Sequence, residues 1–139
     1  MKAKRDEQKV NVRLKIAAAW ASFSFLYVYV DLFGLYMPGK IDDILIGRVF
    51  EFDITQGFLL TSLVLVSIPI LMIFFSTILP AKLSRWANII VATLFIPFTL
   101  FNLVGGFWTF MAYGAVVEVI LLCLIIGYAW KWPKSVRQS

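Results

Sequence analysis

The chain has 139 residues, of which 61% are hydrophobic and 15% are charged, and its mean hydropathy is +0.87. Soluble domains are about 45–50% apolar and about 25% charged, so this composition excludes a soluble globular protein. The formal net charge of +5 does not indicate a nucleic-acid partner, because the basic residues flank long apolar runs. With no histidine and one cysteine, Cys123, the chain cannot form an internal disulfide or a His/Cys metal cluster. We therefore expect no cofactor or metal.

Four apolar segments predict membrane-spanning helices, at residues 14–36, 57–79, 86–106 and 109–130. A helix needs roughly 20 apolar residues to cross a hydrocarbon core about 30 Å thick, and each segment meets that length. The first run is too long for the apolar region of a cleaved signal peptide, which has about 7–15 residues, so we expect a retained anchor. The fold class is thus an all-α integral membrane four-helix bundle, with residues 1–139 forming a single domain.

The basic residues predict the orientation of these spans. Of the 13 Lys and Arg residues, 11 lie in the N-terminal stretch, the second connector and the C-terminal tail. The opposite side has Lys40 and Arg48 alone. Since cytoplasmic loops carry an excess of Lys and Arg, both termini should face the cytoplasm, with the protein in the inner (plasma) membrane.

The connector of residues 37–56 contains apolar residues mostly at helical spacing: Ile41, Ile44, Leu45, Val49 and Phe52. This spacing predicts a short amphipathic helix over residues 41–52, lying in the outer interface and entered through a turn at Pro38 and Gly39. The alternative is an irregular loop whose apolar side chains dip into the headgroup region.

Four stretches of the sequence, residues 20–41, 55–57, 67–90 and 128–133, carry a resemblance to a known family. The chain resembles a bacterial family of small, uncharacterised four-helix membrane proteins, defined as a domain of unknown function. The resemblance implies a four-helix integral membrane fold in a bacterial inner membrane. It implies no activity, ligand or catalytic residue.

Two ionisable side chains, Asp31 and Glu118, lie well inside the expected spans, both in the outer half. A charged side chain at the centre of a membrane helix costs roughly 2.5–3.5 kcal/mol on insertion scales. No basic residue lies deep in any span to compensate for this cost. Each carboxyl group must therefore be protonated, be solvated in a cavity, or bind a cation.

Neighbouring polar residues extend this pattern, because helical spacing places Ser24 and Tyr27 on the face of Asp31 and Asn102 lies at similar depth. The predicted intramembrane polar site comprises Asp31, Glu118, Tyr27, Asn102 and Ser24. One interpretation is that these groups hold the bundle together through hydrogen bonds between helices, with Asp31 reaching the interface or pairing with Lys40. The other is a proton or cation site.

The sequence shows no nucleophile with a base and no cofactor motif, so we do not expect an enzyme. Two functions remain. The chain is a structural membrane protein, or one that interacts with a partner or a lipid; alternatively, it is a small proton- or cation-coupled transporter or channel that uses Glu118 and Asp31. A transporter would require a homo-oligomer, because one four-helix bundle is too thin to enclose a sizeable substrate. Pro69 and Pro97, near mid-depth, predict kinks that shape packing or mark a transport site.

Overall fold

The computed structural model describes residues 5, 7–104 and 106–134. Its four long helices are α1 (Val12–Gly34), α3 (Gln56–Ile78), α4 (Ala81–Phe101) and α5 (Thr109–Trp130). Each is long and apolar enough to cross a membrane. The prediction of an all-α chain with four candidate membrane-spanning helices is therefore confirmed.

Local signals explain where the helices begin and end. The Asn11 side chain accepts a hydrogen bond of 2.8 Å from the backbone N–H of Arg13, so α1 begins two residues before the expected span. The Thr55 hydroxyl accepts one of 3.0 Å from the N–H of Phe58 at the start of α3. Helix α4 begins directly after Pro80, five residues before the predicted span, because Lys82, Ser84 and Arg85 make its first residues polar.

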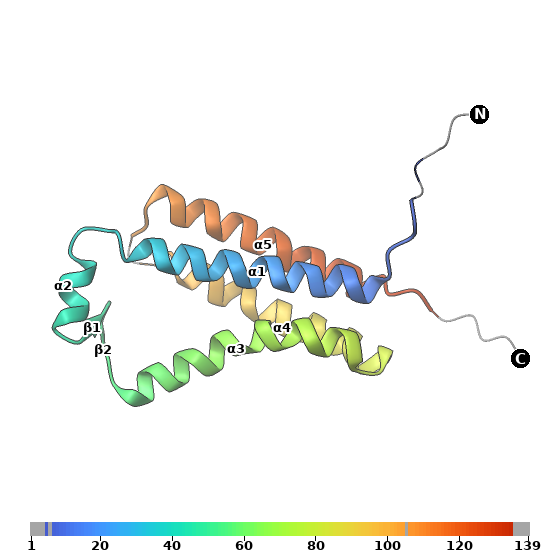
Figure 1. The fold of residues 1–139 in the computed structure, drawn as a ribbon, viewed down its shortest axis with the longest axis horizontal. Coiled ribbons are helices and arrows are strands. Elements are labelled where there is room, and N and C mark those ends of the chain that lie inside the picture. Colours follow the sequence, from blue (N-terminus) through green and yellow to red (C-terminus); the bar gives the residue numbers. More distant parts are fainter. Residues whose placement is uncertain (1–4, 6, 105, 135–139) are drawn as a thin grey trace, which may run out of the picture.

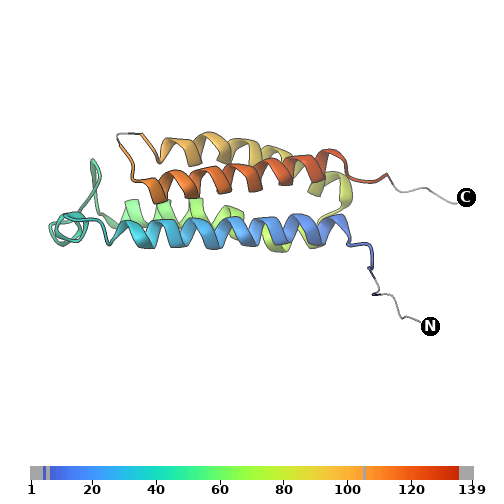
Figure 2. The ribbon, with the colours of Figure 1, turned by 90° about the horizontal axis from the view of Figure 1, so that it is seen from above.

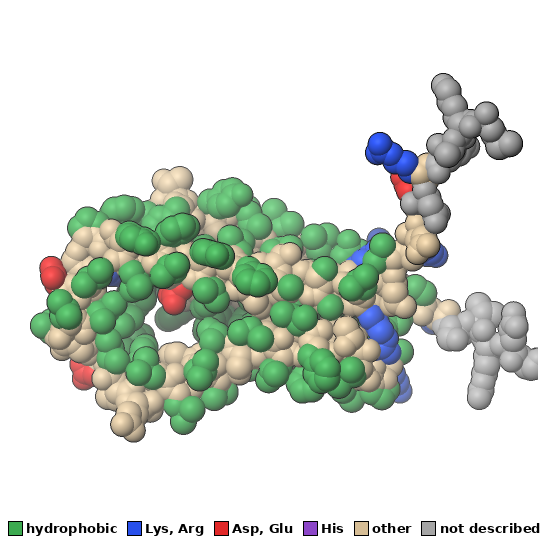
Figure 3. All heavy atoms as spheres, viewed as in Figure 1, with side chains coloured by type: hydrophobic (Ala, Val, Ile, Leu, Met, Phe, Trp, Pro, Cys, Tyr) green, Lys and Arg blue, Asp and Glu red, His purple; other side chains and the backbone are tan. Residues whose placement is uncertain are grey.

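The helices form an antiparallel bundle in which α1 packs against α5 and α3, and α4 packs against α5 (Figures 1 and 2). Contacts between α3 and α4 are few. The beginning of α1, the end of α5 and the α3–α4 turn lie together at what we call the basic end, where basic side chains gather (Figure 3). The opposite end, where α2 lies, is the α2 end.

The core lies in the middle of the bundle and at its basic end. Trp20 and Phe23 pack edge to face with centroids 5.8 Å apart, and Phe23 packs in the same way on Phe95 at 6.0 Å. Helix α1 buries no residue after Phe23, and α3 buries none before Pro69. The halves of α1 and α3 near the α2 end therefore contribute no fully buried side chain.

The connector corrects one prediction. Helix α2 (Lys40–Leu45) forms, but it ends at Leu45 and is followed by a hairpin of β1 (Arg48–Val49) and β2 (Phe52–Asp53). Gly47 at φ 83° and Phe50 at φ 53° have left-handed backbone conformations, which a helix continuing to Phe52 could not accommodate. The predicted helix over residues 41–52 is thus wrong beyond Leu45.

Candidate functional site

Glu118 lies on α5 against α1, with 3% of its surface exposed. A Cβ placed on Gly114 would stand 3.3 Å from Glu118 Oε2 and 2.5 Å from Val30 Cγ2. The missing side chain at Gly114 therefore lets α1 approach α5 closely beside the carboxyl group. Across the described residues, no hydrogen bond or ion pair reaches the Glu118 carboxyl.

Tyr27 connects α1 to the end of α4. Its hydroxyl accepts a hydrogen bond of 3.2 Å from Asn102 Nδ2, and its ring stacks on Phe98 with centroids 6.2 Å apart. The carboxyl groups of Asp31 and Glu118 both lie close enough to the Tyr27 hydroxyl to interact with it electrostatically. The structure thus gathers three of the predicted site residues, Asn102, Asp31 and Glu118, around Tyr27.

Asp31 is exposed on α1. It makes no hydrogen bond or ion pair with any residue that the structure describes. The expected pairing with Lys40 is not formed, because the Lys40 ammonium lies over the Phe50 ring, 4.4 Å from its centroid. The lysine therefore makes a cation–π contact within the connector.

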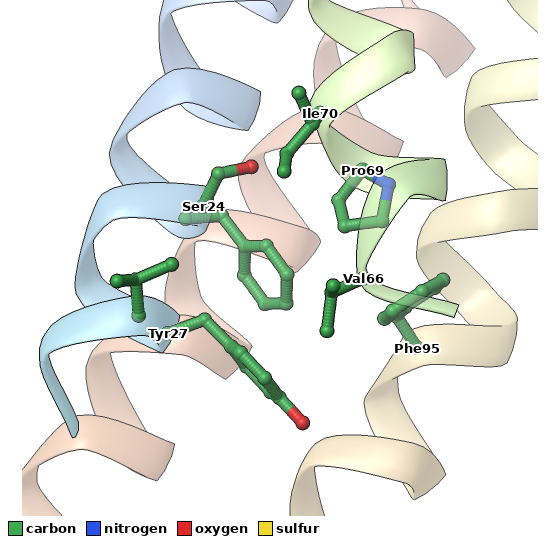
Figure 4. Close-up of a pocket in the computed structure, with 8 residues that line it drawn as sticks. Ser24, Tyr27, Val66, Pro69, Ile70 and Phe95 are labelled. Atoms are coloured by element: carbon green, nitrogen blue, oxygen red, sulfur yellow. The ribbon is translucent and has the colours of Figure 1, made fainter. Parts of the chain in front are cut away.

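Ser24 lies apart from this group, in a small cavity between α1, α3 and α4. Its hydroxyl oxygen is buried and, among described residues, has no hydrogen-bond partner. The volume open to the centre of a water molecule is about 10 Å³, at the lower limit for holding one water. Figure 4 shows the Ser24 hydroxyl pointing toward α3, and the Tyr27 hydroxyl pointing away from Ser24. The cavity is lined by Phe23, Ser24, Tyr27, Val28, Val66, Pro69, Ile70 and Phe95.

This cavity lies where α1 and α3 separate. Pro69 is buried in α3, and because proline has no N–H it cannot donate to the carbonyl of Leu65, which weakens the helix at this point. Toward the α2 end α3 runs away from α1 (Figure 1), and the space-filling view is hollowed there, with an acidic side chain at the edge (Figure 3). We call this space, together with the Ser24 cavity, the lateral hollow.

The basic end holds a buried polar network that the sequence reasoning missed. Trp20 Nε1 donates to Asn88 Oδ1 at 2.7 Å, and the Ser76 hydroxyl donates to the same oxygen at 3.1 Å. Asn88 Nδ2 in turn donates to the Ser84 carbonyl at 2.8 Å. All four side chains have 0% exposure, so the network joins α1, α3 and α4 through satisfied hydrogen bonds. An amide inside an apolar span was the signal available in the sequence.

Two arginines at the same end bind the last carbonyls of neighbouring helices. Arg13 NH1 donates to the Leu79 carbonyl at 2.7 Å, and Arg85 Nε donates to the Ala129 carbonyl at 3.0 Å. Helix C-termini have unsatisfied carbonyls and partial negative charge. These basic residues therefore stabilise the helix ends as well as forming part of the charge asymmetry.

Residues 3–139 match the model of a family of unknown function, DUF6326. The chain belongs to that family. This finding confirms the resemblance to an uncharacterised family, which supplies no activity or ligand. No curated protein and no solved structure matches the chain.

In this DUF6326 chain, the described ranges contain no group of three or more His, Cys, Asp or Glu side chains placed to hold a metal ion. Its polar groups instead divide between the two ends of the bundle. Those of the basic end are hydrogen-bonded, whereas Glu118, Asp31 and the Ser24 hydroxyl near the α2 end have no hydrogen-bond partner within the described part of the chain. The half of the bundle near α2 therefore contains the polar groups that are available to bind a ligand.

Proposed function

We propose that this chain is a multi-pass protein of the bacterial inner membrane, with both termini in the cytoplasm, which acts by binding a lipid or another membrane protein within the bilayer. The 11 basic residues on the side of the termini support this orientation. The long apolar helices and the family support the membrane assignment.

One observation supports the binding function. The half of α3 before Pro69 has no fully buried residue, and it diverges from α1 toward the α2 end (Figure 1). In a bilayer, one face of a helix normally contacts lipid, while the other packs against its neighbours. Here the face toward α1 is only half-buried, at Phe58, Ser62 and Val66, although the core is fully buried toward the basic end. A binding partner that enters the lateral hollow would complete this half of the bundle.

We propose no catalytic activity, because the sequence has no histidine and one cysteine, and shows no paired nucleophile and base. A second function, proton- or cation-coupled transport, is favoured by the 3% exposure of Glu118 and the absence of a partner for its carboxyl among the described residues. Such a transporter would have to be a homo-oligomer to enclose a pathway.

Native mass spectrometry of the full chain, extracted mildly from its membrane, tests the binding function. We expect a lipid or a second protein to remain bound in a fixed ratio. A bare monomer after mild extraction, from preparations in which circular dichroism shows intact helices, would contradict the proposal. A homo-oligomer without bound lipid, together with proton-driven uptake in vesicles, would favour the transporter instead.

A further inference from the structure

We propose that the lateral hollow holds one acyl chain of a phospholipid whose headgroup carries a primary ammonium, such as phosphatidylethanolamine, and that Asp31 binds this ammonium. The inference rests on the proposed function and names the class of ligand. It follows from the shape of the hollow, its length along α1, and the charges at its mouth.

The shape favours a single hydrocarbon chain over a helix. At its Ser24 end the hollow is a cavity of about 10 Å³, measured for the centre of a water molecule, and its lining includes the apolar side chains of Val28, Val66 and Ile70; Figure 4 shows Val66 and Ile70 facing Ser24. A helix with its side chains is about 10–12 Å wide and packs at axis distances of about 8–10 Å. It could not reach this apex without separating α1 from α3, whereas the methyl end of an acyl chain could.

The length of the hollow fits one leaflet. From Ser24, at the apex, to Gly34, where α1 ends, the helix rises roughly 15 Å at about 1.5 Å per residue. Half of a hydrocarbon core about 30 Å thick has the same depth. A chain entering from the headgroup region of the near leaflet would therefore end at Ser24.

Asp31 lies near the mouth of the hollow, just inside the headgroup level, on the side of α1 that carries Ser24 and Tyr27. It follows Ser24 by seven residues and Tyr27 by four, a spacing that places all three on one helix face. It precedes the end of α1 by three residues, roughly 4–5 Å along the axis. Its carboxyl is exposed and, in the described chain, has no partner, so it is free to accept hydrogen bonds from an ammonium.

The surrounding charges select against an anionic headgroup. The two basic residues of the connector are engaged: Lys40 lies over the Phe50 ring at 4.4 Å, and Arg48 NH2 donates to the Glu51 carbonyl at 3.5 Å. The connector also contains the acidic residues Asp42, Asp43, Glu51 and Asp53. The mouth of the hollow is thus net acidic, which favours an ammonium and repels an anionic headgroup.

The test uses the full chain in nanodiscs that contain equal amounts of phosphatidylethanolamine and phosphatidylglycerol with the same acyl chains. After partial delipidation, native mass spectrometry should show one retained phosphatidylethanolamine per chain. Asp31→Asn should reduce the preference for this lipid about tenfold, the effect of losing a hydrogen bond to a charged group. Asp43→Asn, which removes the same charge from exposed α2, should leave the preference unchanged.

A second pair of variants tests the hollow itself. Val66→Trp should fill the space beside Ser24 and abolish lipid retention, whereas Val64→Trp, on the opposite face of α3 and 53% exposed, should not. If Val66→Trp fails to fold, Val66→Phe serves in its place. Suppose the unmodified chain retains both lipids equally and the Val66 variant retains neither. This result would overturn the headgroup assignment and leave the proposed function standing. Retention unaffected at Val66, or a dimer that excludes lipid, would overturn the inference entirely.

Discussion

The indole N–H of Trp20 donates a 2.7 Å hydrogen bond to Asn88 Oδ1 across the interface of α1 and α4, with both side chains fully buried. Asn88 also accepts from Ser76 and donates to Ser84. One amide therefore satisfies the buried polar groups of three helices. Near the α2 end, by contrast, the Ser24 and Thr99 hydroxyl oxygens are buried without a hydrogen-bond partner among the described residues.

We predict that Asn88→Leu destabilises the bundle by about 1–3 kcal/mol, because it leaves the Trp20 indole and the Ser76 hydroxyl buried and unpaired. Reversible unfolding in mixed micelles, followed by circular dichroism, measures the free energy of unfolding. Asn102→Leu is the matched control, since Asn102 is exposed and makes a single hydrogen bond to Tyr27. Equal losses in the two variants would count against a structural role for the buried network.

Glu118→Leu should behave in the opposite way to Asn88→Leu. Among the described residues the Glu118 carboxyl has no hydrogen-bond partner, so its loss leaves no other polar group without a partner. The substitution also removes a buried ionisable group from an apolar span. We expect the free energy of unfolding to stay the same or increase. A loss of more than about 1 kcal/mol would mean that the carboxyl holds helices together. The conservative Glu118→Gln should leave lipid retention unchanged, whereas a transporter would lose coupled flux.

Gly114 provides a test of the contact between α1 and α5. A Cβ at this position would lie 2.5 Å from Val30 Cγ2, so Gly114→Ala should cost about 1–3 kcal/mol through overpacking. Val30→Ala should recover much of the loss in the double variant. Gly127→Ala, on the same helix with no atom within 4 Å of the added Cβ, should be neutral or slightly stabilising. Destabilisation of similar size at both glycines would show that the close approach is not the cause.

The orientation predicts which connectors are accessible from outside the cell. In a Cys123→Ala background, a cysteine in place of Asp43, on exposed α2, should react with a membrane-impermeant reagent on intact cells. A cysteine in place of Lys82, which is exposed after the α3–α4 turn, should react after the cells are lysed. Labelling at Lys82 but not at Asp43 in intact cells would invert the topology.

The sequence predicts the four spans because an apolar run of sufficient length is a local property. It misplaces the start of α4, since Lys82 and Arg85 lie in its polar first two turns. The hairpin after Leu45 was missed because the apolar residues of that segment suit a helix, whereas the left-handed Gly47 and Phe50 end it. The spacing of apolar residues along the sequence does not predict these backbone conformations.

The polar site was predicted in part. Helical spacing brought Ser24, Tyr27 and Asp31 to one face, and the structure adds Asn102 as a partner of Tyr27. The Ser24 hydroxyl lies apart from Tyr27 and Asp31, because it points into the cavity toward α3 (Figure 4). Which residues of different helices meet depends on helix rotation and tilt, which the spacing of residues within one helix does not determine. The lateral hollow is thus a tertiary feature that no single segment encodes.

Photo-crosslinking in living cells tests most directly whether the lateral hollow is a binding site. A photoreactive amino acid replaces Val66, which lines the hollow, or Val64, which lies on the opposite face of α3 and is 53% exposed. After irradiation, intact-protein mass spectrometry should show one discrete lipid or protein adduct at Val66 and a weak, heterogeneous set of adducts at Val64. The same heterogeneous adducts at both positions would contradict a binding site between α1 and α3.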